Sequence, residues 1–165
     1  MDKTDLLFLL DYSAWANQKL SKAAAQLSPG QFTASCPANY GNLRRIFVHM
    51  LVAHQVWLSR CRDGCTPTAF PADDVFPDFV SFEKYLRIEE AAWRDYLDAL
   101  SDKDVQRSVV YTTSRGETFS TPLWQIVAHL VNHTTQHRSE AAEVLTQQGY
   151  SPGDLDLIRY LQRQS

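Results

Sequence analysis

Apolar residues recur every three to four positions along four long stretches of this 165-residue chain, the spacing of amphipathic helices. Polar and charged residues occupy the remaining positions, so each predicted helix has one face to bury. The first predicted helix runs from a cap at Asp2 or Thr4 to about Leu27, and the second from Leu43 to about Arg62. The third runs from a cap at Ser81 to about Leu100. The fourth has its cap at Thr121 and Pro122 in its first position, and it ends at Gly149. Four such helices joined by modest connections favour a helical bundle.

The segments between these helices have a different composition. Residues 28–42 are rich in Pro and Gly and predict a loop. Residues 108–119 change to β-branched and aromatic side chains, which indicates a short hairpin, and a short terminal helix is expected after Ser151 and Pro152. The fold class predicted is therefore all-α: an up-down four-helix bundle with a short terminal helix and a small β-hairpin before the fourth helix. Residues 1–165 are expected to form a single domain.

Three of the five histidines follow one another at four-residue intervals on the fourth helix: His129, His133 and His137. Residues four apart lie one above another on a helix, and neighbouring imidazoles at that spacing can share a metal ion. On the helical wheel His137 lies within the apolar stripe, His133 on its shoulder and His129 further out. His133 and His137 are thus the inward pair. The competing interpretation is a histidine-rich solvated face that needs no metal.

A metal ion would need at least one more ligand, and the second helix offers His49 or His54. Bundles build metal sites in their cores from side chains on facing helices. His54 lies near the centre of the apolar face and His49 on its flank, so the pattern makes His54 the more buried of the two. It does not decide which histidine binds metal. Three imidazoles would leave a coordination position for water or substrate, as in catalytic sites.

Charge and composition exclude several classes of function. The formal net charge is −3 and no basic run occurs, which argues against a nucleic-acid partner. No stretch is apolar enough to be a transmembrane helix or a signal peptide, so no membrane partner and a cytoplasmic location are expected. The odd count of three cysteines predicts free thiols. Cys61 and Cys65 are four residues apart, but Gly64 indicates a helix end there, which weakens them as metal ligands.

Four segments in the right order resemble the DinB/YfiT-like superfamily of four-helix-bundle metalloproteins, and the resemblance covers nearly the whole chain. The matching segments are YSAWAN at 12–17, GNL at 41–43 followed by His49 and Trp57, HLVNHTTQHR at 129–138, and GYSP at 149–152 followed by DLD at 154–156. This chain departs from the usual pattern at His54, where the family often has an acidic residue. A second departure is Gln136, where a histidine is common.

The resemblance implies a site for nickel, zinc or a similar divalent ion, formed by His49, His133 and His137. Characterised relatives act as thiol-dependent transferases or isomerases with a low-molecular-weight thiol. The resemblance thus suggests a metal-dependent enzyme acting on a small molecule, possible reactions being thiol-dependent S-transfer and metal-dependent hydrolysis. The alternatives are a non-catalytic metal or small-ligand binding protein and a helical-bundle dimer with incidental histidines.

Four further residues are candidates for supporting the ligands or lining a cavity: His54, His129, Tyr12 and Asn17. The first three are also acid–base candidates, although each is of a type that more often simply packs or faces solvent. Asn17 falls in the middle of the first apolar stripe, where an amide needs a hydrogen-bond partner. It is interpreted as a buried structural amide or part of a lined cavity. Exposed apolar residues on the third and terminal helices suggest a homodimer.

Overall fold

A computed structural model describes residues 1–38, 40–113 and 115–163 of the chain. Its elements, in order, are α1 (Lys3–Ala24), α2 (Pro29–Thr33), α3 (Leu43–Arg62), the 3₁₀ turn η1 (Asp73–Val75), α4 (Phe79–Asp98), α5 (Asp102–Val105), β1 (Ser108–Thr112), β2 (Thr118–Pro122), α6 (Leu123–Gln147) and α7 (Leu157–Gln162). The predicted fold class, a four-helix bundle with a small hairpin and a short terminal helix, is confirmed.

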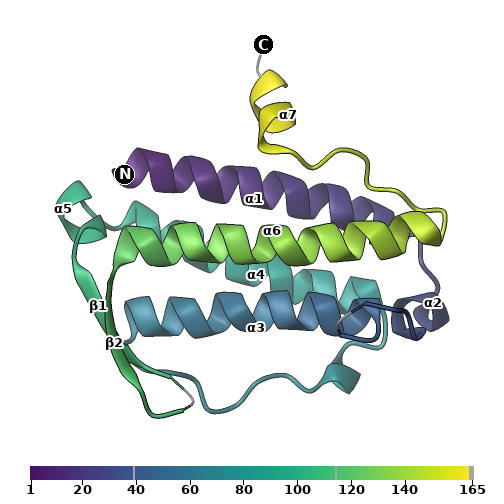
Figure 1. The fold of residues 1–165 in the computed structure, drawn as a ribbon, viewed down its shortest axis with the longest axis horizontal. Coiled ribbons are helices and arrows are strands. Elements are labelled where there is room, and N and C mark those ends of the chain that lie inside the picture. The colour runs from purple at the N-terminus through teal and green to yellow at the C-terminus, as the bar shows by residue number, and fades with distance from the viewer. Residues whose placement is uncertain (39, 114, 164–165) are drawn as a thin grey trace.

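Helices α1, α3, α4 and α6 form the bundle, with α1 and α3 each packed against both α4 and α6 (Figure 1). Figure 1 shows that α1 and α6 run in one direction and α3 and α4 in the other, because the loop over residues 63–78 returns along the bundle. The predicted up-down order therefore does not hold between α3 and α4, although the four-helix bundle itself does. The hairpin lies at one end, α2 at the other, and α7 lies outside α1. The bundle therefore has an α3–α6 side and, opposite to it, an α1–α4 side.

Side-chain caps fix where the long helices begin. The Asp2 carboxylate accepts a hydrogen bond from the Asp5 amide at 2.9 Å, and the Asn42 side chain accepts one from the Arg45 amide at 2.9 Å. The predicted cap at Ser81 is wrong: Asp78 caps α4, with its Oδ1 accepting from the Ser81 amide at 2.8 Å. The Ser81 hydroxyl instead donates to the Asp78 carbonyl. A carboxylate three residues upstream thus begins the helix earlier.

Other predicted boundaries also differ from the structure. The first helix ends at Ala24, and Ser28 then caps the five-residue α2 within the predicted loop. The predicted cap at Thr121 is replaced by pairing, since β2 continues to Pro122 and α6 starts at Leu123 without a side-chain cap. β1 and β2 are antiparallel and in register from the Ser108–Pro122 pair onward. Thr121 is therefore a strand residue paired with Val109, and its side chain does not cap α6.

The bundle interior consists of two hydrophobic clusters with a polar layer between them. The cluster toward α2 is rich in phenylalanine, and the cluster toward the hairpin contains Trp93 and residues from α1, α3 and α6. Between them, five polar residues are almost fully buried: Ser13, Asn17, His54, Thr134 and Arg138. In the described part of the chain, no helix is long and apolar enough to cross a membrane.

Candidate metal centre

Three imidazoles converge between α3 and α6, at the level of the polar layer. His49 comes from α3, and His133 and His137 come from successive turns of α6. One potential ligand atom from each residue lies within 4.8 Å of the other two. His137 is buried, whereas His49 and His133 are half-buried, so two of the three rings are partly exposed to solvent. The predicted inward pair on α6 thus meets His49 rather than His54.

The spacing and chemistry of this cluster fit a divalent ion. The Nε2 atoms of His49 and His133 are 3.1 Å apart. Two nitrogens bound tetrahedrally to zinc at about 2.0–2.1 Å lie about 3.3 Å apart, which is close to the observed separation. Neutral imidazoles are good ligands for zinc and nickel and poor ones for magnesium or calcium. The same separation also suits a hydrogen bond between the two rings, so elemental analysis must distinguish the two arrangements.

Glu140 and Tyr40 surround the cluster. Glu140 Oε2 lies 2.9 Å from His137 Nδ1, and a hydrogen bond donated by Nδ1 leaves Nε2 as the free nitrogen. Tyr40 stacks on His49 with ring centroids 4.6 Å apart and meets His137 edge-on at 5.3 Å. Burial, and secondarily the negative charge of Glu140, raise the pKa of Tyr40. The phenol is therefore protonated and can donate a hydrogen bond at neutral pH.

Burial keeps two histidines of the cluster neutral. Desolvation, reinforced by the nearby His137, His49 and His129, lowers the pKa of His133 to about 4. Desolvation also lowers the pKa of His49, assisted by His137 and opposed by Glu140. A metal binds the unprotonated ring, so protons compete weakly with a cation at these two positions near neutral pH. The electrostatics of the cluster thus suit metal binding.

His54 lies inside the bundle and apart from the three converging histidines. Its side chain is 3% exposed, and neither ring nitrogen has a hydrogen-bond partner among the described residues. Desolvation, with smaller contributions from Arg138 and His133, lowers the pKa of His54 to about 4. The prediction that His54 is the more deeply buried histidine of α3 is confirmed. Its ring lies in the polar layer and not in the three-histidine cluster.

Two other candidate residues, His129 and Tyr12, lie in different parts of the bundle. His129 is exposed and stacks on His133, with ring centroids 5.7 Å apart, while its other side packs on Trp57. Tyr12 is buried, and its hydroxyl donates to the Leu155 carbonyl at 3.0 Å, which ties α1 to the C-terminal segment. Tyr12 thus supports the fold here, while His129 adjoins the cluster.

Asn17 belongs to a buried network that joins α1, α4 and α6. Its Nδ2 donates to Glu90 at 2.7 Å, and its Oδ1 accepts from Arg138 at 3.4 Å. Arg138 also donates to Ser13 at 2.7 Å and to Thr135 at 2.6 Å. Burial raises the pKa of Glu90 and lowers that of Arg138, the expected cost of removing charges from water. Asn17 is therefore a structural amide that also lines a cavity.

Among the described residues, no cysteine belongs to the group of potential metal ligands. Cys36, Cys61 and Cys65 are free thiols, as predicted from their odd count. Burial raises the pKa of Cys61 to about 12, which keeps its thiol protonated and a poor metal ligand at neutral pH. Cys65 is exposed and lies 3.4 Å from the Ser59 hydroxyl.

The sequence analysis did not identify Tyr40 or Glu140 as site residues. Tyr40 lies in a loop, where no periodicity indicates which way a side chain points. Glu140 carried a usable signal, because it follows His137 by three residues and therefore shares its helical face. A carboxylate at that spacing from a candidate ligand is a typical partner for the other ring nitrogen.

These observations define a helical-bundle protein with a three-histidine cluster suited to a divalent ion. The chain belongs to the DinB family, whose family model matches residues 1–165. Among curated proteins, it is similar to Protein DinB of Bacillus subtilis (strain 168), with 19% identity over 157 residues, 93% of this chain and 91% of that protein.

Among solved structures, the chain is similar to YfiT from Bacillus subtilis, described as a probable metal-dependent hydrolase with an unusual four-helix bundle topology. The TM-score is 0.62 at 17% identity, covering 90% of this chain and 89% of YfiT. At this identity the similarity shows a shared fold.

Proposed function

We propose that the protein is a divalent-metal-dependent enzyme that hydrolyses a small molecule, with the ion held by His49, His133 and His137. The observation that carries the proposal is the convergence of three imidazoles, two of them half-buried and accessible to solvent. Three protein ligands leave a coordination position for water or substrate, whereas purely structural zinc sites use four. Nickel or zinc is the proposed ion because all donors are imidazole nitrogens.

A divalent ion held there would lower the pKa of a bound water and polarise a substrate oxygen. The contributions of the protein itself follow from the contacts described above. Glu140 holds the His137 ring in one tautomer, Tyr40 fixes the His49 ring by stacking, and the Tyr40 phenol can donate a hydrogen bond to a bound oxygen. Glu140 also lines a cavity of about 200 Å³ with Pro37 and Ala38, although the three histidines are not part of its lining.

The test compares protein purified without a histidine tag with two single variants. Elemental analysis should find about one divalent ion per chain, lost in His133→Ala and retained in His129→Ala, which removes a histidine one turn earlier. A panel of small esters, amides and phosphate esters should then reveal hydrolysis by the metal-loaded protein and by His129→Ala only. Absence of bindable metal, or hydrolysis that survives His133→Ala, would overturn the proposal.

Thiol-dependent S-transfer is the second candidate, supported by the resemblance in helix sequence and by the suitability of an open metal position for a thiolate. Repeating the assay with electrophilic substrates and low-molecular-weight thiols separates the two reactions. Turnover that requires the thiol would assign transfer instead of hydrolysis. Metal binding without turnover of either kind would assign a non-catalytic role, in which the ion joins α3 to α6. The homodimer and the cytoplasmic location remain predictions.

A further inference from the structure

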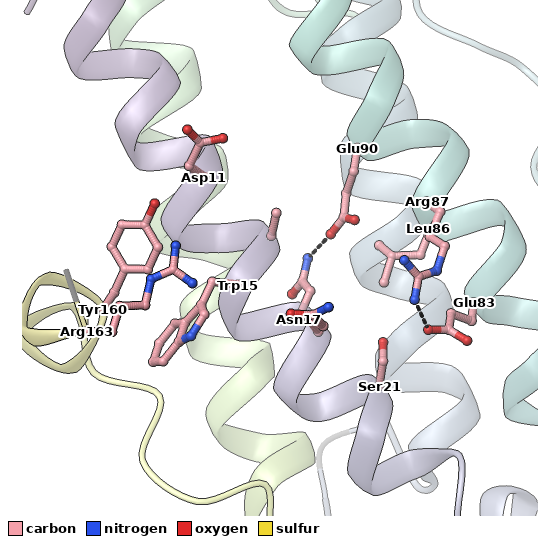
Figure 2. Close-up of a pocket in the computed structure, with 12 residues that line it drawn as sticks. Asp11, Trp15, Asn17, Ser21, Glu83, Leu86, Arg87, Glu90, Tyr160 and Arg163 are labelled. Atoms are coloured by element: carbon pink, nitrogen blue, oxygen red, sulfur yellow. Dashed lines mark hydrogen bonds and ion pairs between the residues drawn. The ribbon is translucent and has the colours of Figure 1, made fainter.

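A cavity of about 270 Å³ lies between α1 and α4, across the bundle from the histidine cluster. Leu10, Ala14 and Trp93 form apolar walls, and His54 reaches it from α3. A larger cavity of about 480 Å³ adjoins it along the same two helices and shares Asp11 and Glu90 with it (Figure 2). Two adjoining cavities thus lie on the side of the bundle opposite the proposed metal centre.

His54 is the unusual member of the smaller cavity. The residue is only 3% exposed, and both ring nitrogens lack a hydrogen-bond partner among the described residues. A buried polar group without a partner costs roughly 1–3 kcal/mol, so native structures rarely keep one without a reason. The His54 main chain does not share this deficit, since the Trp93 indole donates to the His54 carbonyl at 3.2 Å.

The charged groups around the cavity already have partners. Arg94 pairs with Asp11 across the α1–α4 boundary, and Arg87 pairs with Glu83 at 2.7 Å. Glu90 points toward Asn17 and accepts its hydrogen bond, as Figure 2 shows. A ligand with its own net charge would have to compete with these contacts. The neutral imidazole of His54 offers one donor and one acceptor and has neither in use.

We propose that the α1–α4 cavity is a second ligand site, which binds a small, uncharged, largely apolar molecule through one hydroxyl or amide group bonded to His54. The apolar walls favour a hydrocarbon or aromatic body, because burying it releases water from both surfaces. The volume lies just below the range of about 300–1,000 Å³ typical of sites for drug-sized ligands, so the ligand is about the size of a substituted benzene. This site does not depend on the proposed hydrolysis.

The test uses 4-fluorophenol as the probe and 4-fluorotoluene as its matched control without a hydroxyl, both titrated into the intact protein and followed by fluorine NMR. The phenol should bind roughly tenfold more tightly than the toluene, the gain expected for one hydrogen bond to a buried group. Failure of 4-fluorophenol to bind at millimolar concentration would overturn the proposal and leave the cavity to water. Equal binding of both probes would overturn the role of His54.

Variants locate the probe. Ala91→Leu extends a side chain from exposed α4 backbone into the cavity and should abolish binding, whereas Ala99→Leu adds the same group at the exposed end of that helix and should not. His54→Phe should remove the preference for the phenol. Ala91→Leu tests the site even if His54→Phe fails to fold, which circular dichroism would reveal. Binding that persists in Ala91→Leu, or that disappears in His133→Ala, would place the probe elsewhere and overturn the proposal.

Discussion

The orientation of single side chains decides the chemistry of the histidine cluster. Glu140 contacts His137 Nδ1 at 2.9 Å, and Tyr40 packs on both His49 and His137. Neither residue is among the three proposed ligands, but each limits how those rings can turn. A carboxylate that holds a ligating imidazole raises the basicity of the ring and fixes its tautomer. The cluster is thus a set of oriented nitrogens, and its supporting contacts can be tested separately.

Glu140→Gln should weaken metal binding by about 10- to 100-fold, because an amide orients the His137 ring less strongly than a carboxylate and carries no charge. Competition with a chromophoric chelator at neutral pH measures the affinity. Glu143→Gln is the matched control, since Glu143 is an exposed acid on the same helix, three residues further on. Equal affinities in the two variants would show that Glu140 does not support the ion.

The metal-free protein should lose stability as the pH falls from about 6.5 to about 4. The pKa of His54 is about 4 when folded and about 6.5 in an unfolded chain, so between these values the unfolded chain binds the proton more strongly. The contribution of neutral His54 to the free energy of unfolding is fully present above about pH 6.5. Its loss amounts to roughly 3 kcal/mol once the pH has fallen to about 4. His133 adds to the loss in the same direction, because its pKa is also about 4.

Urea denaturation of metal-free protein at a series of pH values measures this loss. His54→Phe keeps a ring of similar size and removes the titrating group, so its free energy of unfolding should fall less steeply over the same interval. An identical pH dependence in the two proteins would mean that the buried ring does not titrate as its surroundings require.

At the scale of elements, the polar layer aligns the bundle helices with one another. Arg138 of α6 donates to Ser13 and approaches Asn17 on α1, and Asn17 continues the network to Glu90 on α4. Apolar contacts alone allow one helix to slide along another, whereas a buried guanidinium with several acceptors has few satisfactory positions. The layer also lies level with His133 and His137, so it sets the depth at which these side chains face α3.

Arg138→Met should lower the free energy of unfolding by roughly 2–4 kcal/mol, because the buried acceptors on Ser13 and Asn17 lose their donor. Arg87→Met is the control: Arg87 is exposed and pairs with Glu83, a contact worth about 0–1 kcal/mol. Denaturant unfolding of the metal-free variants provides the comparison. A similar small loss in both would show that the network does not stabilise the bundle.

At the scale of the whole molecule, the proposed metal centre joins segments far apart in the sequence. His49 and His133 are 84 residues apart along the chain. An ion shared between them would cross-link α3 and α6 and favour the folded state over the unfolded one. On the opposite side of the bundle, the described residues include no second group of potential metal ligands, and the α1–α4 cavity interrupts the packing there. Metal should therefore stabilise the protein measurably.

Addition of nickel or zinc at 100-fold over the dissociation constant should stabilise the protein by about 2.7 kcal/mol. For a chain of this length that corresponds to a rise in Tm of roughly 5–10 °C. Calorimetry of the intact protein, His129→Ala and His133→Ala with and without the ion measures it. The rise should occur in the first two and vanish in the third. An equal rise in all three would indicate binding elsewhere.

Much of the architecture could be predicted because it depends on local physics. The period of apolar residues indicates where helices lie, and a cap such as Asn42 is equally local, because its side chain bonds an amide only three residues along the chain. Likewise the four-residue spacing of His133 and His137 puts both on one face of any helix that contains them. The cap at Ser81 was wrong because Asp78, three residues upstream, caps the helix by accepting from the Ser81 amide, so Ser81 lies inside α4.

The sequence by itself determined the four amphipathic helices, the hairpin before α6 and the histidine pair, since each follows from contacts within about one turn or one strand pair. Only the tertiary structure decided that His49 meets this pair while His54 turns into the polar layer. Both lie on α3, and the difference depends on which helices pack on each side. Tyr40, Glu90 and the α1–α4 cavity were likewise settled by packing between distant segments, which no local spacing encodes.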